Sequence, residues 1–397
     1  MNKNIKLAVA GAVLAMSASA ANAGIIIPAG DWTLDVNGNV NAYAIFGKAK
    51  DGNDIVGGLA NKKDGASESN GQGINTGLLP AWIGFTGNTR QNDTDVSFTI
   101  SMQPNVSDNA ISGDVKVPLF RQANLTFGDK SWGSIKLGKD IGIFASNAIL
   151  NDMTLLGVGS GNAMSGGATT LGGIGTGYIY AGWKGQVAYT TPNFNGFQAT
   201  VGLINPNQGV LENGVSTATL LNQDRFGLEG QANYAFAADN FSGKIWVGGA
   251  SYKVKPTSAI EYTATAADIG ATINAGNVGL TGYYYAGEGA GSYMFHSRGV
   301  DANGKKRDSD GGYLQATYIL PTKTKMGIAY GTSRLDPSSA ETATSLFKEN
   351  ERTTFGLYHP LTKHLNLVAE YNNIESKSHS GLKNTSQTGS FGAILFF

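Results

Sequence analysis

The sequence predicts an all-β fold, a transmembrane antiparallel β-barrel of 16 strands. Three observations lead to this prediction. Apolar and polar residues alternate along most of the chain, and short polar turns separate pairs of alternating segments. Beyond the N-terminus, no stretch resembles a membrane helix, which needs about 20 apolar residues. Because lipid offers no hydrogen-bond partners, a membrane chain without helices must close its sheet into a barrel.

The N-terminus predicts a signal peptide. Residues 1–23 contain two lysines, an uncharged apolar run, and the small-x-small motif Ala21-Asn22-Ala23. The apolar run is too short to cross a bilayer as a helix. We therefore expect cleavage after Ala23, so that residues 24–397 form the barrel. The alternative, a buried N-terminal helix, does not explain this three-part pattern.

Composition argues against several classes of function. The formal net charge is zero, whereas nucleic-acid binders carry a basic surface. The chain has no cysteine, which excludes disulfides, a thiol nucleophile and a cysteine-bound metal. Its four histidines are scattered without the spacing of a metal site. No catalytic or phosphate-binding motif occurs, so we expect neither an enzyme nor a cofactor.

The first segment after the signal peptide shows the clearest strand pattern. Even positions from Trp32 to Phe46 are apolar or small, while odd positions from Thr33 to Asn41 are polar. A helix would mix the two sets, but a strand places them on opposite faces. The same alternation recurs in residues 95–103, 197–203, 225–234 and 365–372.

Short turns determine the predicted number of strands. Long polar segments alternate with seven short turns, which lie at residues 88–93, 128–133, 192–196, 235–240, 275–277, 321–323 and 360–363. Seven turns and the closure of the barrel correspond to eight hairpins, and therefore to 16 strands. Short turns at the periplasmic end and long loops outside are typical of outer-membrane barrels.

Four segments carry a resemblance to a known family. They are residues 120–128, Leu137-Gly138-Lys139-Asp140, residues 191–197, and the C-terminal strand 389–397, which ends on Phe397. In order and spacing they resemble the general trimeric porins of Gram-negative outer membranes, over essentially the whole mature chain. The resemblance implies a water-filled channel in the outer membrane for passive diffusion of small hydrophilic solutes and ions.

The same resemblance implies partners. We expect a homotrimer that contacts outer-membrane lipid and lipopolysaccharide, with residues 51–76 as a candidate loop that latches a neighbour. Phe397 would serve as the signal read by the barrel-assembly machinery. No nucleic acid and no cofactor are implied.

By resemblance, the loop from Ile141 to about Gly177 folds into the barrel and narrows it. This loop offers one carboxylate, Asp152, and then a run rich in glycine and serine. On the facing wall the family pattern points to Lys139 and, less directly, Lys184. Lys139 is therefore expected to face the constriction and to make the channel weakly anion-selective. A lysine at the rim that extends to water is the other interpretation of Lys139.

Other residues leave two interpretations open. Trp82 and Trp183 lie at or beside basic positions of the family, but each also suits the lipid-facing aromatic girdle. Arg225 and Glu229 share the inward parity of one strand, where they could line the pore or neutralise each other. Arg121 has outward parity, which costs about 2–4 kcal/mol at mid-bilayer. A bulge or an interfacial position must therefore relieve it.

Three other functions compete with passive diffusion. A substrate-selective channel would bind a sugar or an aromatic solute at an aromatic-lined constriction, through Trp82, Trp183, Tyr283 or Tyr285, although packing against the wall explains the tyrosines better. Solute-dependent, saturable block of the conductance would identify it. A barrel enzyme needs a nucleophile–base pair, which the sequence does not suggest. A structural barrel with a plugged lumen would show no conductance.

Overall fold

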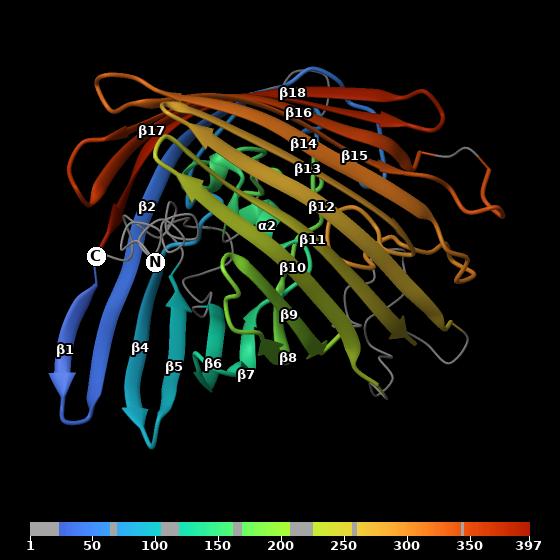
Figure 1. The fold of residues 1–397 in the computed structure, drawn as a ribbon. Helices are drawn as coiled ribbons and strands as arrows, with labels where there is room; N and C mark the ends of the chain where they lie inside the picture. Colours follow the sequence, from blue (N-terminus) through green and yellow to red (C-terminus); the bar gives the residue numbers. More distant parts are fainter. Residues whose placement is uncertain are drawn as a thin grey trace.

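The computed structural model describes residues 24–63, 70–104, 119–161, 169–206, 225–255, 260–342 and 345–397. The expected signal peptide lies outside these residues. The described part of the chain forms one antiparallel sheet of 18 strands. Two of these strands are short and each lies in line with another strand: β1 with β18 along one edge of β2, and β3 with β4 along the other edge. The remaining 16 strands close into a barrel, as the sequence predicts (Figure 1).

The strands of the barrel follow one another around the wall in chain order. They are β2 (Trp32–Ala49), β4 (Trp82–Gln91), β5 (Thr94–Gln103), β6 (Leu119–Asp129), β7 (Gly133–Ile141), β8 (Trp183–Thr190), β9 (Phe197–Ile204), β10 (Gly227–Ala238), β11 (Phe241–Val254), β12 (Tyr262–Ala275), β13 (Val278–Glu288), β14 (Asp308–Ile319), β15 (Lys325–Leu335), β16 (Phe347–Pro360), β17 (Leu365–Ser378) and β18 (Lys383–Phe396). The barrel closes where β18 pairs with β2.

The closure uses both ends of the described chain. β1 (Ile25–Ala29) pairs with the first residues of β2, on the edge that β18 occupies farther along. β3 (Asn70–Asn75) pairs with the last part of β2, on the edge that β4 occupies near its start. The terminal residue is fixed by a reciprocal pair of backbone hydrogen bonds between Gly38 and Phe397, at 2.8 and 3.0 Å.

Each of the seven predicted short turns connects two neighbouring strands at one end of the barrel. The opposite end carries the longer connections, with one exception. Only residues 379–382 link β17 to β18 at that end. Because family barrels have short turns on the periplasmic side, we call the end with the long connections the outer end.

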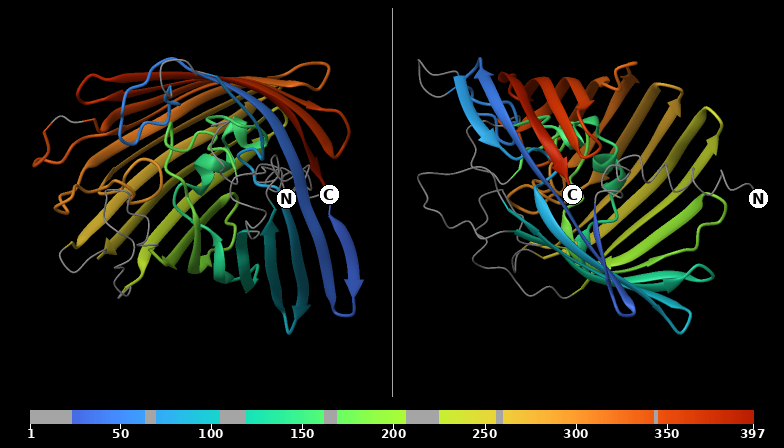
Figure 2. Two further views of the ribbon diagram at one scale, coloured as in Figure 1. Left: turned by 180° about the vertical axis from the view of Figure 1, so that it is seen from behind. Right: turned by 90° about the vertical axis from the view of Figure 1, so that its left-hand side faces the viewer.

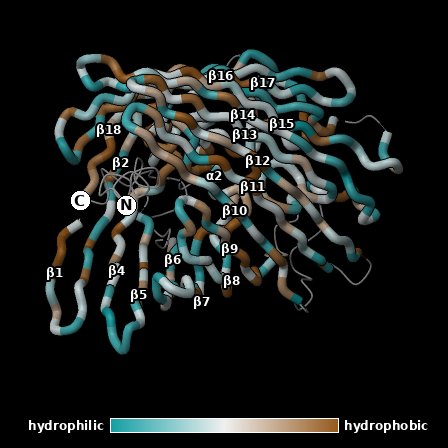
Figure 3. The backbone as a smooth tube through the Cα atoms, in the orientation of Figure 1, coloured by the Kyte–Doolittle hydropathy of each residue, from teal (hydrophilic) through white to brown (hydrophobic). Residues whose placement is uncertain are grey.

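The alternation places apolar residues outside and polar residues inside. Outward side chains such as Val40, Val201, Ile269, Leu314 and Phe355 are each more than half exposed. Together with similar residues they form the apolar outer band that a barrel presents to lipid, visible as alternating colour along the strands in Figure 3. Among the described residues, no helix is long and apolar enough to cross a membrane.

Residues 142–161 and 169–182, called here the inserted loop, fold into the lumen (Figures 1 and 2). The described part of the loop contains the helix α2 (Ser146–Leu150) and the 3₁₀-helix η1 (Met153–Leu156). Its apolar side packs on the inner wall of the barrel. The cluster includes Phe144, Ile149, Tyr178, Trp246, Tyr252, Tyr283, Tyr285 and Tyr313. This is the position expected of the predicted constriction loop.

The first long loop, predicted in residues 51–76 to latch a neighbour, is attached to its own barrel. β3 belongs to the wall, and the residues before it bond to side chains of β16, β17 and β18. The backbone N–H of Leu59 donates to Asn350 and to Ser376, and that of Asn61 donates to Ser386, at 2.9–3.1 Å. These contacts attach the described part of the loop to its own chain, and its role as a latch stays a prediction. Residues 64–69 lie outside the described part.

Candidate functional site

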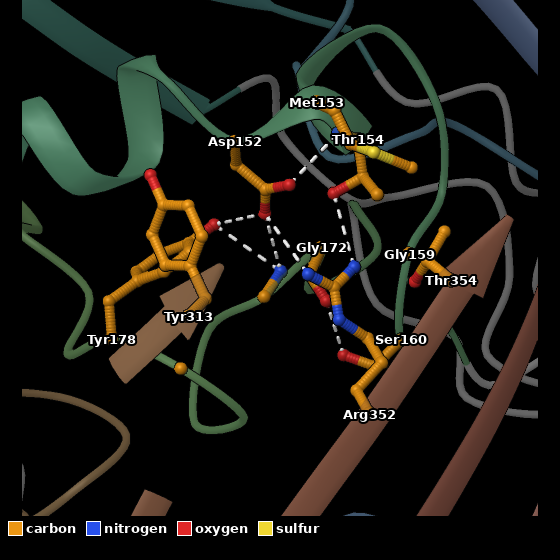
Figure 4. Close-up of polar contacts among 12 residues, drawn as sticks. Asp152, Met153, Thr154, Gly159, Ser160, Gly172, Tyr178, Tyr313, Arg352 and Thr354 are labelled. Carbon is orange, nitrogen blue, oxygen red and sulfur yellow. Dashed lines mark hydrogen bonds and ion pairs between the residues drawn. The ribbon is translucent and has the colours of Figure 1, made fainter. Parts of the chain in front are cut away.

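Asp152 lies at the centre of the loop's attachment to the wall (Figure 4). One carboxylate oxygen accepts the N–H of Thr154 at 2.9 Å. The other accepts the N–H of Gly173 and the hydroxyl of Tyr178, each at 2.9 Å, and lies 3.5 Å from the guanidinium of Arg352. The side chains of Asp152 and Arg352 are at most 2% exposed. The expectation that Asp152 faces solutes as a pore charge is therefore wrong, because its carboxylate is buried against Arg352 and binds N–H groups of the loop.

Arg352 is the wall residue that the sequence analysis missed. It lies on β16, where Phe355 and Leu357 point outward and the even-numbered residues from 350 to 358 point into the lumen. Its guanidinium also donates to the hydroxyl of Thr154 at 3.3 Å. The signal that could have identified it was present, because strict alternation from Phe355 places residue 352 inside.

A second attachment joins Lys184 and Glu229. Their charged atoms lie 2.6 Å apart, with side chains 5% and 0% exposed. Glu229 also accepts the successive backbone N–H groups of Ile143 and Phe144, at 2.7 and 3.1 Å, and the hydroxyl of Tyr252. The wall thus holds the start of the inserted loop through one buried carboxylate. Neither Lys184 nor Glu229 presents a free charge to the lumen, contrary to the expectation that both line the pore.

Arg225 does not neutralise Glu229, as one interpretation of their shared parity proposed. It is exposed and precedes the first residue of β10. The cation paired with Glu229 is Lys184, which comes from β8. The alternation along the strand correctly predicted that Glu229 points inward. Its charge partner, however, lies on a different strand of the wall.

Glu370 repeats the arrangement on the opposite side. This buried carboxylate of β17 accepts the N–H groups of Val158 and Gly159, at 2.9 and 2.7 Å, and the hydroxyl of Tyr358 at 2.7 Å. Two wall glutamates therefore each bind two successive N–H groups of the inserted loop. A buried carboxylate requires such donors, because unsatisfied it would be strongly destabilised. The alternation found in residues 365–372 contained Glu370, but nothing in the sequence indicated its partners.

The structure contradicts the prediction that Lys139 faces the constriction. Lys139 is exposed and pairs across the sheet with Ala123 and Gly185, whose parity is outward. Its ammonium donates to the backbone carbonyl of Phe120 at 2.9 Å. Outward Leu137 fixes this face, since residues two apart on a strand point the same way. The alternation along β7, and not the family motif, agrees with the orientation of Lys139.

The predicted relief of Arg121 is confirmed. The register between β5 and β6 shifts at Ser101/Met102, so Arg121 is the extra residue of a bulge. Its guanidinium carbon lies 5.9 Å from the centre of the Trp183 ring. Trp183 has the outward parity of exposed Val187, so it faces away from the lumen.

Trp82, unlike Trp183, faces the lumen. It pairs with buried Asn39 on the inward face of β2. Its ring N–H donates to Asn37 at 3.4 Å, and its ring centre lies 6.4 Å from that of Phe396. Trp82 therefore belongs to the lumen wall rather than to the lipid-facing girdle. Tyr283 and Tyr285, by contrast, are 5% and 0% exposed beneath the inserted loop, where no solute reaches them.

Lys136 and Asp140 form the charged pair next to the base of the loop. Both have inward parity on β7, and the Lys136 ammonium bonds the Asp140 carboxylate. The amide of Gln122 also donates to Asp140, at 3.1 Å. The lysine side chain is 37% exposed and the aspartate 9%, so solutes meet the positive end of the pair. Neither residue is among the site residues that the sequence predicts.

The lumen opens toward the short turns in a cavity of about 880 Å³. Amides, hydroxyls and a few charges line it, as in a hydrated vestibule. Its charged groups include the guanidinium of Arg90, which lies 2.8 Å from the carboxylate of Asp95 and 2.9 Å from that of Asp129. The remaining wall includes Thr33, Asn88, Ser97, Thr126, Ser134, Asn193 and Gln198.

Comparison with known proteins agrees with this architecture. Residues 8–379 match the Gram-negative porin family. The outer membrane channel DcaP of Acinetobacter baumannii has a similar structure, with a TM-score of 0.68 and 16% identity over 94% of this chain and 100% of that one. The anion-selective porin from Comamonas acidovorans gives 0.64 and 15%, over 92% and 100%. OmpT of Vibrio cholerae, in its trimer form, gives 0.55 and 13%, over 92% and 99%. The sequence finds no match among curated proteins.

Proposed function

The chain belongs to the Gram-negative porin family and is an outer-membrane channel, and we propose that it lets small hydrophilic solutes and ions diffuse passively with a weak preference for anions. The observation that carries this proposal is the compensation of charge around the inserted loop. Asp152 is paired with Arg352, and Glu229 with Lys184. A lumen whose charges are paired exerts only a weak field on passing ions.

The preference for anions rests on the exposed end of one pair. Lys136 is 37% exposed and its partner Asp140 only 9%, so the nearest charge to a passing ion is positive. A unit charge about 8 Å away contributes ~0.5 kcal/mol at the dielectric of water, which changes the local concentration of an ion about twofold, upward for anions and downward for cations. Selectivity of this size weakens as salt shortens the Debye length, about 10 Å at 0.1 M.

Planar-bilayer recording of Lys136→Gln and Lys139→Gln tests this proposal. The wild-type protein should form open channels with a reversal potential slightly favouring anions at low salt. Lys136→Gln should move the reversal potential toward cations, while Lys139→Gln, a lysine of the same strand that points outward, should leave it unchanged. No conductance would reject the channel mechanism. A shift with Lys139→Gln alone would reject the assignment of the positive charge to Lys136.

The assembly and processing of the chain belong to the same proposal. A homotrimer is supported by the trimer form of a structural neighbour, and detergent-resistant trimers that dissociate on heating would be the expected gel pattern. Signal cleavage after Ala23, assembly through Phe397, and contact with lipopolysaccharide are further parts of it. Deleting Phe397 should lower the folded yield, because its backbone bonds close the barrel at Gly38.

One residue favours the alternative function, a channel that binds a sugar or an aromatic solute. Of the four aromatic side chains considered for it, Trp82 faces the lumen and is partly exposed. Saturable block by a sugar that disappears in Trp82→Ala would support this alternative. Passive diffusion remains the proposal, because Trp82 also packs against Phe396 and so has a place in the wall.

A further inference from the structure

A groove of about 400 Å³ lies on the barrel near its outer end, where β17, β18, β2 and β3 run side by side. Its lining consists of Phe46, Gly47, Lys48, Asn70, Gly71, Gln72, Tyr371, Gln387, Thr388 and Gly389. Phe46 and Tyr371 both have outward parity on their strands. The groove therefore belongs to the outer face of the wall and is separate from the lumen.

The apolar part of the groove is a slot between two aromatic residues. Cross-strand pairing places Tyr371, Gly389 and Phe46 next to one another on β17, β18 and β2. Neighbouring strands lie about 4.8 Å apart, so the two aromatic residues are about 10 Å apart at the backbone, on either side of the glycine. A Cβ atom built on Gly389 would meet no atom within 4 Å, so the space above it is open. Such a slot is wide enough for one hydrocarbon chain.

The next residues toward the outer end make the groove polar. The row that follows the slot across β18, β2 and β3 consists of Gln387, Lys48 and Asn70. Lys50 follows Lys48 on the same face, and both lysines are exposed. A step of two residues along a strand is about 6.8 Å, so the two ammonium groups begin one and two steps beyond Phe46. The groove thus crosses the boundary between the apolar band and the polar outer surface.

The charge at this boundary is positive. Lys377 and Lys383, on β17 and β18 farther toward the outer end, are paired with carboxylates. Lys48 and Lys50, by contrast, form no ion pair with any residue that the structure describes. No carboxylate is among the residues that line the groove. The polar part of the groove therefore matches an anionic group.

We infer that this groove binds lipopolysaccharide, with one hydrocarbon chain in the slot over Gly389 and a phosphate of the headgroup at Lys48 and Lys50. Lysines just beyond an apolar band lie at the level of lipid headgroups, and their ammonium groups bind phosphate. The amides of Gln387 and Asn70 supply donors and acceptors for sugar hydroxyls, which favours a glycolipid over a phospholipid. The inference rests on the proposed function, because lipopolysaccharide surrounds a barrel only in the outer membrane.

Titration of the detergent-solubilised protein with bisphosphorylated lipid A tests the inference, with the bound lipid counted by native mass spectrometry. The double variant Lys48→Gln/Lys50→Gln should weaken binding by about tenfold or more, as expected for the loss of two lysines beside an anionic headgroup. Gly389→Leu should also weaken binding, because the new side chain occupies the slot. Lys323→Gln is the matched control, because Lys323 is an exposed lysine of a short turn at the other end of the barrel.

The outcomes separate this site from the channel function. Equal binding of lipid A by the wild type and all three variants would overturn the inference. Equally tight binding of phosphatidylglycerol by the wild type would overturn the choice of a glycolipid. If Gly389→Leu lost its trimers on a native gel but bound lipid A normally, the groove would belong to an interface with a second copy of the chain. A wild-type protein without conductance in planar bilayers would reject the proposed function, whatever lipid it binds.

Discussion

The two sides of the lumen wall obey one alternation but have opposite environments. On the open side, β4 to β6 point Thr86, Thr99 and Gln122 inward, and all three remain partly exposed. On the side covered by the inserted loop, β11 and β14 point Trp246 and Tyr313 inward, and these are 1% and 4% exposed. The alternation therefore determines which side chains point inward, while the inserted loop determines whether those side chains are exposed to water.

The charges follow the same division. Beneath the loop they are buried and joined into pairs or bound to backbone N–H groups, as at Glu229 and Glu370. On the open wall and at the mouth, charges such as Arg90 stay solvated, with its side chain 47% exposed. Removing a partner should therefore be costly on one side and nearly neutral on the other.

The largest expected effect is at the Lys184–Glu229 pair. Glu229→Ala should lower the free energy of unfolding by about 3–5 kcal/mol, because it leaves a buried ammonium unpaired and releases two N–H groups of the loop. Unfolding in denaturant, followed by the heat-modifiable gel shift, measures the change. The same variant should increase current noise, because the start of the inserted loop loses its attachment.

Glu288→Ala is the matched control for that variant. Glu288 also lies 2.6 Å from a lysine, Lys306, but the two side chains are 51% and 34% exposed. Solvated pairs contribute about 0–1 kcal/mol, so this variant should unfold almost like the wild type. Equal destabilisation by both variants would show that the loop does not exclude water from the Glu229 side of the wall.

A smaller effect is expected from two tyrosines that each donate to a backbone carbonyl. Tyr313 donates to Ala148 at 2.8 Å beneath the inserted loop, and Tyr189 donates to Trp132 at 2.7 Å on the outer surface. Tyr313→Phe should cost about 1–3 kcal/mol, because it leaves a buried carbonyl without its donor. Tyr189→Phe should change stability by less than about 0.5 kcal/mol, because water replaces the bond. Chemical denaturation of both variants gives the comparison, and a reversed order would contradict it.

The smallest effect concerns the outer loops, where the acid-sensitive contact lies. The Arg307 guanidinium, bonded to both carboxylate oxygens of Glu341, holds the pKa of Glu341 below its ordinary value. A carboxylate with a lowered pKa contributes stability that is complete above its unfolded-state pKa, about 4.3, and is lost as pH falls through the folded-state pKa. Acid should therefore loosen residues 289–307 before the barrel itself unfolds.

Limited proteolysis at decreasing pH measures this loosening. Cleavage within residues 289–307 should increase below about pH 4.3 in the wild type, since Glu341 then begins to bind protons in the unfolded loop. Glu341→Gln should be cleaved faster at neutral pH and should show a smaller further increase as the pH falls. A wild-type loop that stays equally resistant at all pH values would remove Glu341 from this role.

Much of the fold could be predicted because its signals are local. The seven turns lie where polar residues interrupt alternating segments. The cost of a charge facing lipid predicted either a bulge or an interfacial position at Arg121, and the structure has the bulge. The site was harder to predict. Lys139 was assigned to the lumen from a family motif, although outward Leu137 on the same strand places Lys136 and Asp140 inside. The alternation along β7 alone therefore predicts the correct orientation of Lys136, Lys139 and Asp140.

By itself, the sequence determined the strand count, the short turns, and the inward or outward face of residues in the clearly alternating strands, because a period of two is a property of consecutive residues. Only the tertiary structure decided which inward charges are free. Asp152 meets Arg352, and Lys184 meets Glu229, across separations of many residues that no local pattern encodes. These partners come together because the closed barrel brings distant strands around one loop, where buried charges are stable only when they are paired.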